Sequence, residues 1–179
     1  LISILCHSEI EGERLDDEEI IQESLLILVG GDETTRHVIV QGMEALIRHP
    51  EQRQLLIDDP SKVVTAVEEM LRWVSPVMQF RRTALCDTKI GDQTIRKGEK
   101  VVMYYGASNR DPGGFADPEV FDITRKPNPH LAFGVGTHFC MGSHIARLEM
   151  RVTLEEFLRR FPNVNLAGSL ERLQSNFIS

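Results

Sequence analysis

The chain has 179 residues, of which 41% are hydrophobic and 26% are charged, and its formal net charge is −7. This length and composition allow a sizeable core and ordinarily correspond to one domain. The acidic balance, together with the lack of a basic stripe with interleaved aromatics, argues against nucleic acid as a partner. No run of about 18 or more apolar residues occurs, so we do not expect this part of the chain to span a membrane.

Residues 20–49 are predicted to form one long helix, roughly 45 Å in length at 1.5 Å per residue. Asp16 is the expected N-cap, and Glu19, three positions later, completes a capping-box pattern with acids in the first turn. Pro50 follows the expected end of the helix.

The centre of this helix carries the sequence Gly-Gly-Asp-Glu-Thr-Thr at positions 30–35. Each interior glycine costs about 1 kcal/mol relative to alanine, and threonine hydroxyls can bond back to the backbone. The segment therefore predicts a local opening where a ligand or water approaches the backbone. Alternatively, the paired glycines simply admit a crossing helix.

Glu69 and Arg72 lie three positions apart on one face of a helix predicted over residues 63–73. Residues 75–83 end in the pair Arg81 and Arg82. Strand signals cluster after Phe80, where residues 94–95 and 101–105 flank a turn at 96–100. These patterns predict a mainly α fold with a minor β-sheet.

The sequence Phe-Gly-Val-Gly-Thr-His-Phe-Cys-Met-Gly at positions 133–142 immediately precedes an amphipathic helix expected over residues 142–161. Cys140 therefore lies at a helix N-terminus, where the positive end of the dipole favours an ionised thiol. Gly136 and Gly142 permit positive φ and a close approach of the backbone to a ligand.

Cys140 has two other interpretations. One is a buried free cysteine beside a glycine turn. The other is a zinc site with His138, but a structural zinc site needs four ligands, and neither Cys6 nor Cys86 has a partner at short spacing.

The pattern of Phe133, Gly134, Gly136, His138, Cys140 and Gly142 resembles the haem-ligand loop of the cytochrome P450 family. The resemblance implies the C-terminal part of that fold, with the long central helix and the cysteine-ligand loop. It also implies a haem-thiolate monooxygenase in which Cys140 ligates the iron of haem b. A thiolate ligand pushes electron density onto the iron and favours O–O cleavage.

The resemblance also assigns roles to the earlier motifs. Glu33 and Thr34 fall on the acid and alcohol positions of oxygen activation, where Thr34 hydrogen bonds to dioxygen and Glu33 relays protons. Arg82 and His138 are the expected contacts of the haem propionates. Gly142 is expected to let the backbone approach the cofactor closely.

In the family, the pair formed by Glu69 and Arg72 is structural and has a third member, an arginine. Val120 stands near the place expected for that arginine, and Arg125 is the candidate substitute. The remaining histidines are expected at the surface or at helix caps: His7, His37, His49, His130 and His144.

The expected partners are O2, a lipophilic substrate, and a ferredoxin or similar electron donor that docks near Cys140, with a contribution from Arg147. Pocket positions 26–31 and 77–80 are mostly apolar or small. The sequences at 29–37, 127–134 and 173–178 look like those of actinobacterial members that oxidise sterol side chains or branched lipids.

Two alternatives remain open. One is a haem- or ligand-binding protein without turnover. The other is a relative that uses peroxide or catalyses a rearrangement, against which Glu33 and Thr34 argue. Relative to the family, residues 1–179 are expected to be a partial single domain truncated at both ends, and the three unpaired cysteines favour the cytoplasm.

Overall fold

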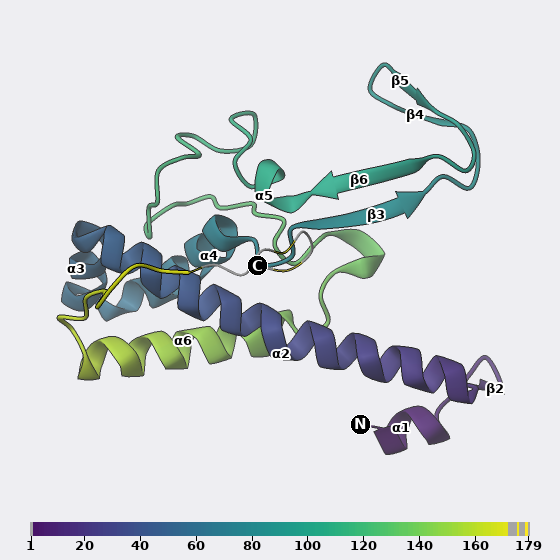
Figure 1. The fold of residues 1–179 in the computed structure, drawn as a ribbon, viewed down its shortest axis with the longest axis horizontal. Helices are drawn as coiled ribbons and strands as arrows, with labels where there is room; N and C mark the ends of the chain where they lie inside the picture. The colour runs from purple at the N-terminus through teal and green to yellow at the C-terminus, as the bar shows by residue number, and fades with distance from the viewer. Residues whose placement is uncertain (1, 172–174, 176–177, 179) are drawn as a thin grey trace.

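A computed structural model describes residues 2–171, 175 and 178 (Figure 1). The helices are α1 (Ile2–His7), α2 (Asp17–Arg48), α3 (Pro50–Asp58), η1 (Pro60–Lys62), α4 (Val63–Val74), α5 (Tyr105–Ser108), η2 (Gly136–His138) and α6 (Ser143–Arg160). The strands are β1 (Glu9–Ile10), β2 (Glu13–Arg14), β3 (Gln79–Thr83), β4 (Thr88–Ile90), β5 (Gln93–Ile95) and β6 (Lys100–Tyr104).

The predicted capping box starts the long helix α2. The backbone N–H of Glu19 donates to Asp16 Oδ1 at 2.8 Å, and the N–H of Asp16 donates to Glu19 Oε2 at 2.9 Å. Both contacts satisfy donors that have no partner within the helix, which confirms the predicted start.

The centre of α2 differs from the prediction, because the helix runs without interruption through Gly30 and Gly31. The Thr34 hydroxyl donates to the Gly30 carbonyl oxygen at 2.6 Å, so it adds a contact to the helix rather than opening it. A Cβ added at either glycine would meet no atom of the described residues within 4 Å. No helix among those residues therefore crosses α2 at this point.

The core lies where the second half of α2 packs against α4 and α6, and Figure 1 shows α2 and α6 as the long helices of the lower layer. Its fully or nearly buried side chains are Val38, Ala45, Leu46, Leu56, Val63, Ala66, Val67, Met70, Leu71, Phe121, Ile123, Met150, Leu154 and Leu158. The crossing of α2 and α4 depends on Gly42. A Cβ there would lie 2.8 Å from Met70 Cγ and 3.1 Å from Met70 Cβ, closer than carbon atoms pack.

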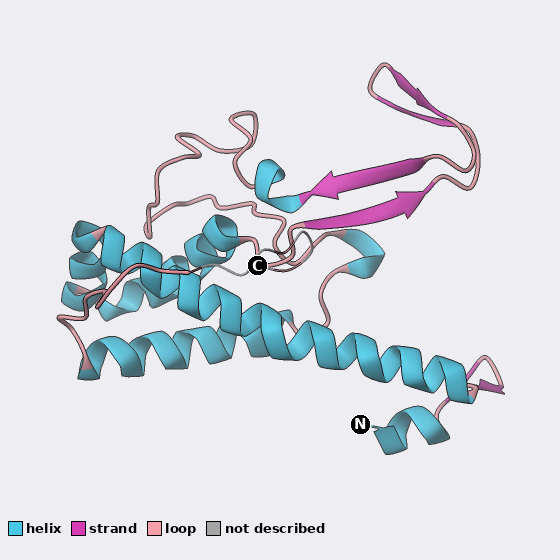
Figure 2. Ribbon diagram, viewed as in Figure 1, coloured by secondary structure: helices cyan, strands magenta, loops and turns pink. Residues whose placement is uncertain are grey.

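The β structure is minor, as predicted, and among the described residues it forms three two-stranded sheets. The predicted strands at 94–95 and 101–105 do not pair with each other, because β5 pairs with β4 and β6 pairs with β3. Strand β3 pairs with β6 in antiparallel register from Gln79 opposite Tyr104 to Thr83 opposite Lys100. The hairpin β4–β5 continues from the far end of this pair and projects away from the helices (Figure 2). Most of residues 173–178, which contributed to the resemblance, lies outside the described residues.

The helix predicted over 142–161 is α6. Met150, Leu154 and Leu158 face the core, whereas Ile145, Leu148 and Val152 are exposed. Only part of the predicted apolar face is therefore covered by the described residues. Among the described helices, none is both long and apolar enough to cross a membrane.

Candidate functional site

The Cys140 loop has a backbone that only glycine accommodates easily at two positions. Gly134 and Gly136 have φ values of 71° and 76°, in the left-handed region that L side chains rarely adopt. The loop is closed by the Cys140 N–H, which donates to the Phe133 carbonyl oxygen at 2.9 Å, and by the Phe139 N–H, which donates to Gly136 at 3.0 Å. These bonds hold Cys140 in a defined place.

The predicted reason for Gly142 is partly wrong, because its φ is −82° and requires no glycine. A Cβ at this position would instead lie 3.9 Å from Cys140 Sγ. An added Cβ would therefore make ordinary van der Waals contact with the sulfur, and the close approach of a ligand at Gly142 stays a prediction.

Cys140 lies two residues before Gly142, the N-cap of α6, and presents an exposed, free thiol. Its carbonyl oxygen accepts a hydrogen bond from the Ser143 N–H, the first residue of α6, at 3.2 Å. The predicted position at a helix N-terminus is confirmed. In the described part of the chain, no three His, Cys, Asp or Glu side chains are grouped as a metal site, so His138 and Cys140 have no second pair of zinc ligands there.

Glu33 and Thr34 lie in the middle of α2 and are partly exposed. The Glu33 carboxylate forms ion pairs with Arg36 and with His37 Nε2, the latter at 3.4 Å. One turn after Thr34, Val38 belongs to the core against which Phe133 of the cysteine loop packs. The Thr34 region and the Cys140 loop are therefore anchored to the same core.

The predicted pair of Glu69 and Arg72 is fully buried and bidentate. Arg72 Nη2 donates to Glu69 Oε1 at 2.7 Å, and Arg72 Nε donates to Glu69 Oε2 at 2.8 Å. Arg125 Nε reaches Glu69 Oε2 at 3.2 Å, so Arg125 is the third member of the network. Val120 contributes its carbonyl oxygen, which accepts from both arginines.

This network also fixes the segment that leads to the cysteine loop. Arg72 donates to the carbonyl oxygen of Asn109 at 2.9 Å, and the buried Asn109 side chain accepts from the Leu131 N–H at 2.7 Å. The chain just before Phe133 is thereby tied to α4.

Arg82 and His138, the two residues expected to contact the haem propionates, are both exposed. Arg82, on β3, places its guanidinium 5.8 Å from the centre of the Phe80 ring, and no acidic side chain among the described residues pairs with it. His138 lies exposed in η2. Arg82 Nη1 donates to the Arg81 carbonyl oxygen at 3.1 Å, and the rest of this exposed guanidinium faces solvent.

Sequence reasoning missed Glu68, and it placed His130 wrongly at the surface or at a cap. The His130 side chain is 4% exposed, and its Nε2 lies 2.9 Å from Glu68 Oε2. Burial opposes ionisation of Glu68, but hydrogen bonds from His130 and Arg147 prevail and lower its pKa to about 2. The only signal in the sequence was the doublet of Glu68 and Glu69, because both partners of Glu68 lie far along the chain.

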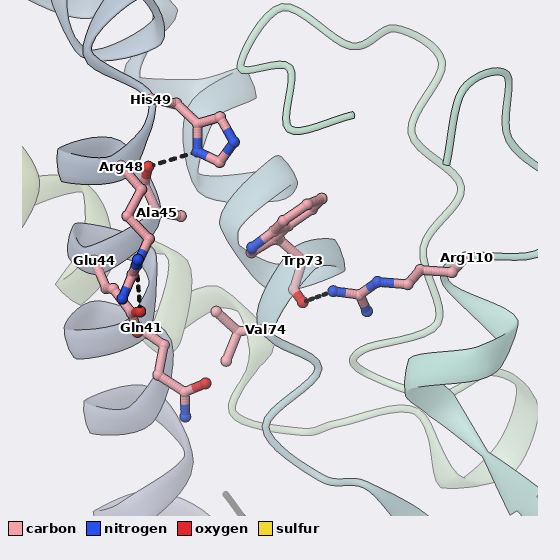
Figure 3. A pocket seen from close by; sticks show the side chains of 8 residues that line it. All are labelled: Gln41, Glu44, Ala45, Arg48, His49, Trp73, Val74 and Arg110. Atoms are coloured by element: carbon pink, nitrogen blue, oxygen red, sulfur yellow. Dashed lines mark hydrogen bonds and ion pairs between the residues drawn. The ribbon is translucent and has the colours of Figure 1, made fainter. Parts of the chain in front are cut away.

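A cavity of about 340 Å³ opens between the second half of α2 and the end of α4 (Figure 3). It is lined by Gln41, Glu44, Ala45, Arg48, His49, Trp73, Val74 and Arg110. Arg110 Nη2 donates to the Trp73 carbonyl oxygen at 2.9 Å, and burial lowers the pKa of this arginine. The lining contains none of the predicted site residues and is largely polar, so we do not assign the substrate to this cavity.

Comparisons with known proteins identify the family of the chain. The family model described as Cytochrome P450 matches residues 1–166. The chain is 47% identical over 181 residues to the steroid C26-monooxygenase of Mycolicibacterium smegmatis, and this match covers 100% of the chain and 45% of that protein. It is 45% identical over 180 residues to the methyl-branched lipid omega-hydroxylase of Mycobacterium bovis, with 99% and 42% covered.

Solved structures with a similar fold indicate the same family. A cytochrome P450 of Mycobacterium marinum, solved in complex with pseudoionone, superposes with a TM-score of 0.93 at 43% sequence identity. That match covers 99% of this chain and 43% of the solved chain. The chain belongs to the cytochrome P450 family. It spans less than half the length of these relatives.

Family membership implies a haem-iron cofactor, and the residues present fit it. The Cys140 thiol is exposed on a loop whose glycines leave open backbone around it. Thiolate is the cysteine form that binds iron. Arg82 supplies an exposed guanidinium suited to a carboxylate of the macrocycle.

Proposed function

We propose that the protein containing this chain is a haem-thiolate monooxygenase that inserts one oxygen atom from O2 into a C–H bond of a lipophilic substrate. The observation that carries the proposal is the Cys140 loop, which holds an exposed thiol at the start of α6 through the bond from Cys140 N–H to the Phe133 carbonyl. The likeness to relatives named monooxygenase and hydroxylase supports it.

Cys140 would bind the iron of haem b through its sulfur, and Arg82 and His138 would bind the propionates. The bound haem supplies the activation of dioxygen. The Cys140 loop orients the sulfur through its two main-chain hydrogen bonds, and Gly142 keeps side-chain atoms away from it. Arginine suits a carboxylate because its planar fork donates two parallel hydrogen bonds.

Thr34 and Glu33 would move protons during the reaction. The Thr34 hydroxyl now donates to Gly30, so its oxygen retains lone pairs that can accept a proton-bearing water. Glu33 lies next to it at the partly exposed surface of α2, paired with Arg36 and His37. A partly exposed carboxylate on the residue that precedes a hydroxyl side chain is suited to relay protons from solvent.

The proposed substrate class is a sterol side chain or a branched lipid. Apolar side chains at the expected pocket positions, Leu26, Val29 and Phe80, are exposed and so are available to a lipophilic molecule. The names of the relatives, one acting on a steroid and one on a methyl-branched lipid, support this class.

Electrons would come from a ferredoxin-type protein, and we propose a cytoplasmic location. The location is supported by Cys6, Cys86 and Cys140, all of which are free thiols.

The test is the reduced, carbon-monoxide difference spectrum of the protein expressed from its complete reading frame, with Cys140→Ser as the matched control. We expect a strongly red-shifted Soret band that Cys140→Ser abolishes. A haem spectrum of the histidine-ligated type would indicate a binding role without turnover, and failure to bind haem would remove the proposal.

A further inference from the structure

Glu68 links α4 to α6 and to the segment that precedes the cysteine loop. On α4, its carboxylate accepts two hydrogen bonds from Arg147 of α6, from Nε to Oε1 at 2.7 Å and from Nη2 to Oε2 at 2.9 Å. The same Oε2 lies 2.9 Å from His130 Nε2, in the segment before the loop. The side chains of Glu68, Arg147 and His130 are 25%, 30% and 4% exposed. Such a bidentate, partly desolvated contact holds its partners in one geometry.

The contacts continue from Arg147 and His130 to the backbone of Cys140 through Phe133. The Arg147 guanidinium lies 4.5 Å from the centre of the Phe133 ring, and the His130 ring centre lies 6.2 Å from it. The Phe133 carbonyl accepts the bond from the Cys140 N–H. Glu68 therefore controls the side chains that flank Phe133, and Phe133 closes the loop that holds the sulfur.

The cluster also places charge near the sulfur. The pKa of Arg147 is raised, and the largest cause is the hydrogen bond with Glu68. Burial opposes this increase, and the charges of Glu68 and Cys140 add to it. The guanidinium lies 4.5 Å from the centre of the ring of Phe133, whose carbonyl oxygen holds the Cys140 N–H, so its positive charge is placed beside the cysteine loop. Glu68 compensates part of this positive charge from the far side of the guanidinium.

We propose that Glu68 is a positioning residue that, through Arg147 and Phe133, sets the geometry and the electrostatic field of the Cys140 thiolate and so the reduction potential of the bound iron. The inference rests on the proposed function, since it requires thiolate ligation. It also gives Arg147 a structural role beside the expected contribution to donor docking, because Nε and Nη2 are bonded to Glu68.

The sign of each effect follows from Coulomb's law, because positive charge near the thiolate favours the reduced iron, which carries one more electron. Glu68→Gln leaves the charge of Arg147 uncompensated, so the midpoint potential should become more positive. Arg147→Gln leaves the Glu68 carboxylate alone, so the potential should become more negative. Glu156→Gln removes the same charge from the exposed, distant end of α6 and is the matched control.

The experiment is a spectroelectrochemical titration of the haem-loaded protein, expressed from its complete reading frame, for wild type and these three variants. Opposite shifts for Glu68→Gln and Arg147→Gln, each larger than that of Glu156→Gln, are expected. Shifts in one direction, or no larger than the control, would overturn the inference, because a purely structural defect has no reason to change sign with the charge removed.

Arg147→Lys provides a second test in case one of the other variants binds haem poorly. Lysine retains the charge but loses the fork and the flat contact with Phe133. We expect a potential near that of wild type, with a several-fold faster conversion of the reduced carbon-monoxide complex to the form that lacks the thiolate. A potential change as large as that of Arg147→Gln would contradict the role of charge. If wild type itself lacks the red-shifted band, the proposed function fails and the inference fails with it; if only the variants disagree, the inference alone fails.

Discussion

Glu69 and Arg72 face each other across one turn of α4, and both side chains are fully buried. Arg72 donates two hydrogen bonds, of 2.7 and 2.8 Å, to the Glu69 carboxylate. The same carboxylate also accepts from Arg125, from the Asn128 side chain at 3.1 Å, and from the Asp122 N–H at 2.9 Å. This buried charge is therefore satisfied by groups that lie far along the chain and bind the loop before the cysteine to α4.

Removal of Arg72 should destabilise the whole protein. Arg72→Met leaves the Glu69 carboxylate buried with fewer donors, and breaking such a pair lowers the free energy of unfolding by about 3–5 kcal/mol. Chemical denaturation and haem retention measure the effect. Arg160→Met is the control, because Arg160 pairs with Glu156 at the surface, where a pair contributes about 0–1 kcal/mol. Equal losses in the two variants would argue against the structural role of the buried pair.

Gly42→Ala should also lower stability, because the new Cβ would overlap the Met70 side chain at the crossing of α2 and α4. Overpacking of this kind costs typically about 1–3 kcal/mol, more than alanine gains in a helix over glycine. Thermal unfolding measures the change. Gly106→Ala, where a Cβ meets no described atom within 4 Å, is the matched control and should be close to neutral.

Thr34→Ala should retain haem but release more peroxide per electron consumed. The side chain makes a single local hydrogen bond, to Gly30, so its removal leaves the core intact. The ratio of product to reductant and the yield of peroxide measure this uncoupling. Thr34→Ser retains the hydroxyl and should restore most of the coupling. Tight coupling in Thr34→Ala would contradict the proposed role.

The stability of the protein should depend on Glu68 in acid. Its folded pKa of about 2 lies below the value near 4.3 of an unfolded glutamate. The stabilisation is therefore present above about pH 4.3 and is lost as the pH falls toward 2, and it amounts to about 2–3 kcal/mol after allowance for partial exposure. Denaturation of wild type and Glu68→Gln at pH 6 and pH 3 measures it. The two proteins should differ more at pH 6.

The exposed Glu156 provides a comparison for that pH dependence. Hydrogen bonds from Arg159 and Arg160 lower its pKa as well, but solvent screens these contacts. Glu156→Gln should therefore change the acid sensitivity less than Glu68→Gln, and the reverse order would contradict the assignment to Glu68.

Features encoded within a few consecutive residues were predicted well. The capping box of Asp16 and Glu19, the pairing of Glu69 with Arg72, and the place of Cys140 before α6 all depend on neighbours no more than a few positions away. Helix caps, turns and contacts within one helical turn are determined by local geometry, so their sequence patterns are sufficient.

Contacts between distant segments were decided by the tertiary structure alone. The burial of His130 against Glu68, the choice of Arg125 over position 120, and the need for glycine at position 42 rather than at 30 and 31 each depend on which helix faces lie together. The sequence by itself determined the local cysteine loop and its family. The packing of α2, α4 and α6 determined which charges surround it, because burial and pairing arise only when residues about sixty positions apart meet.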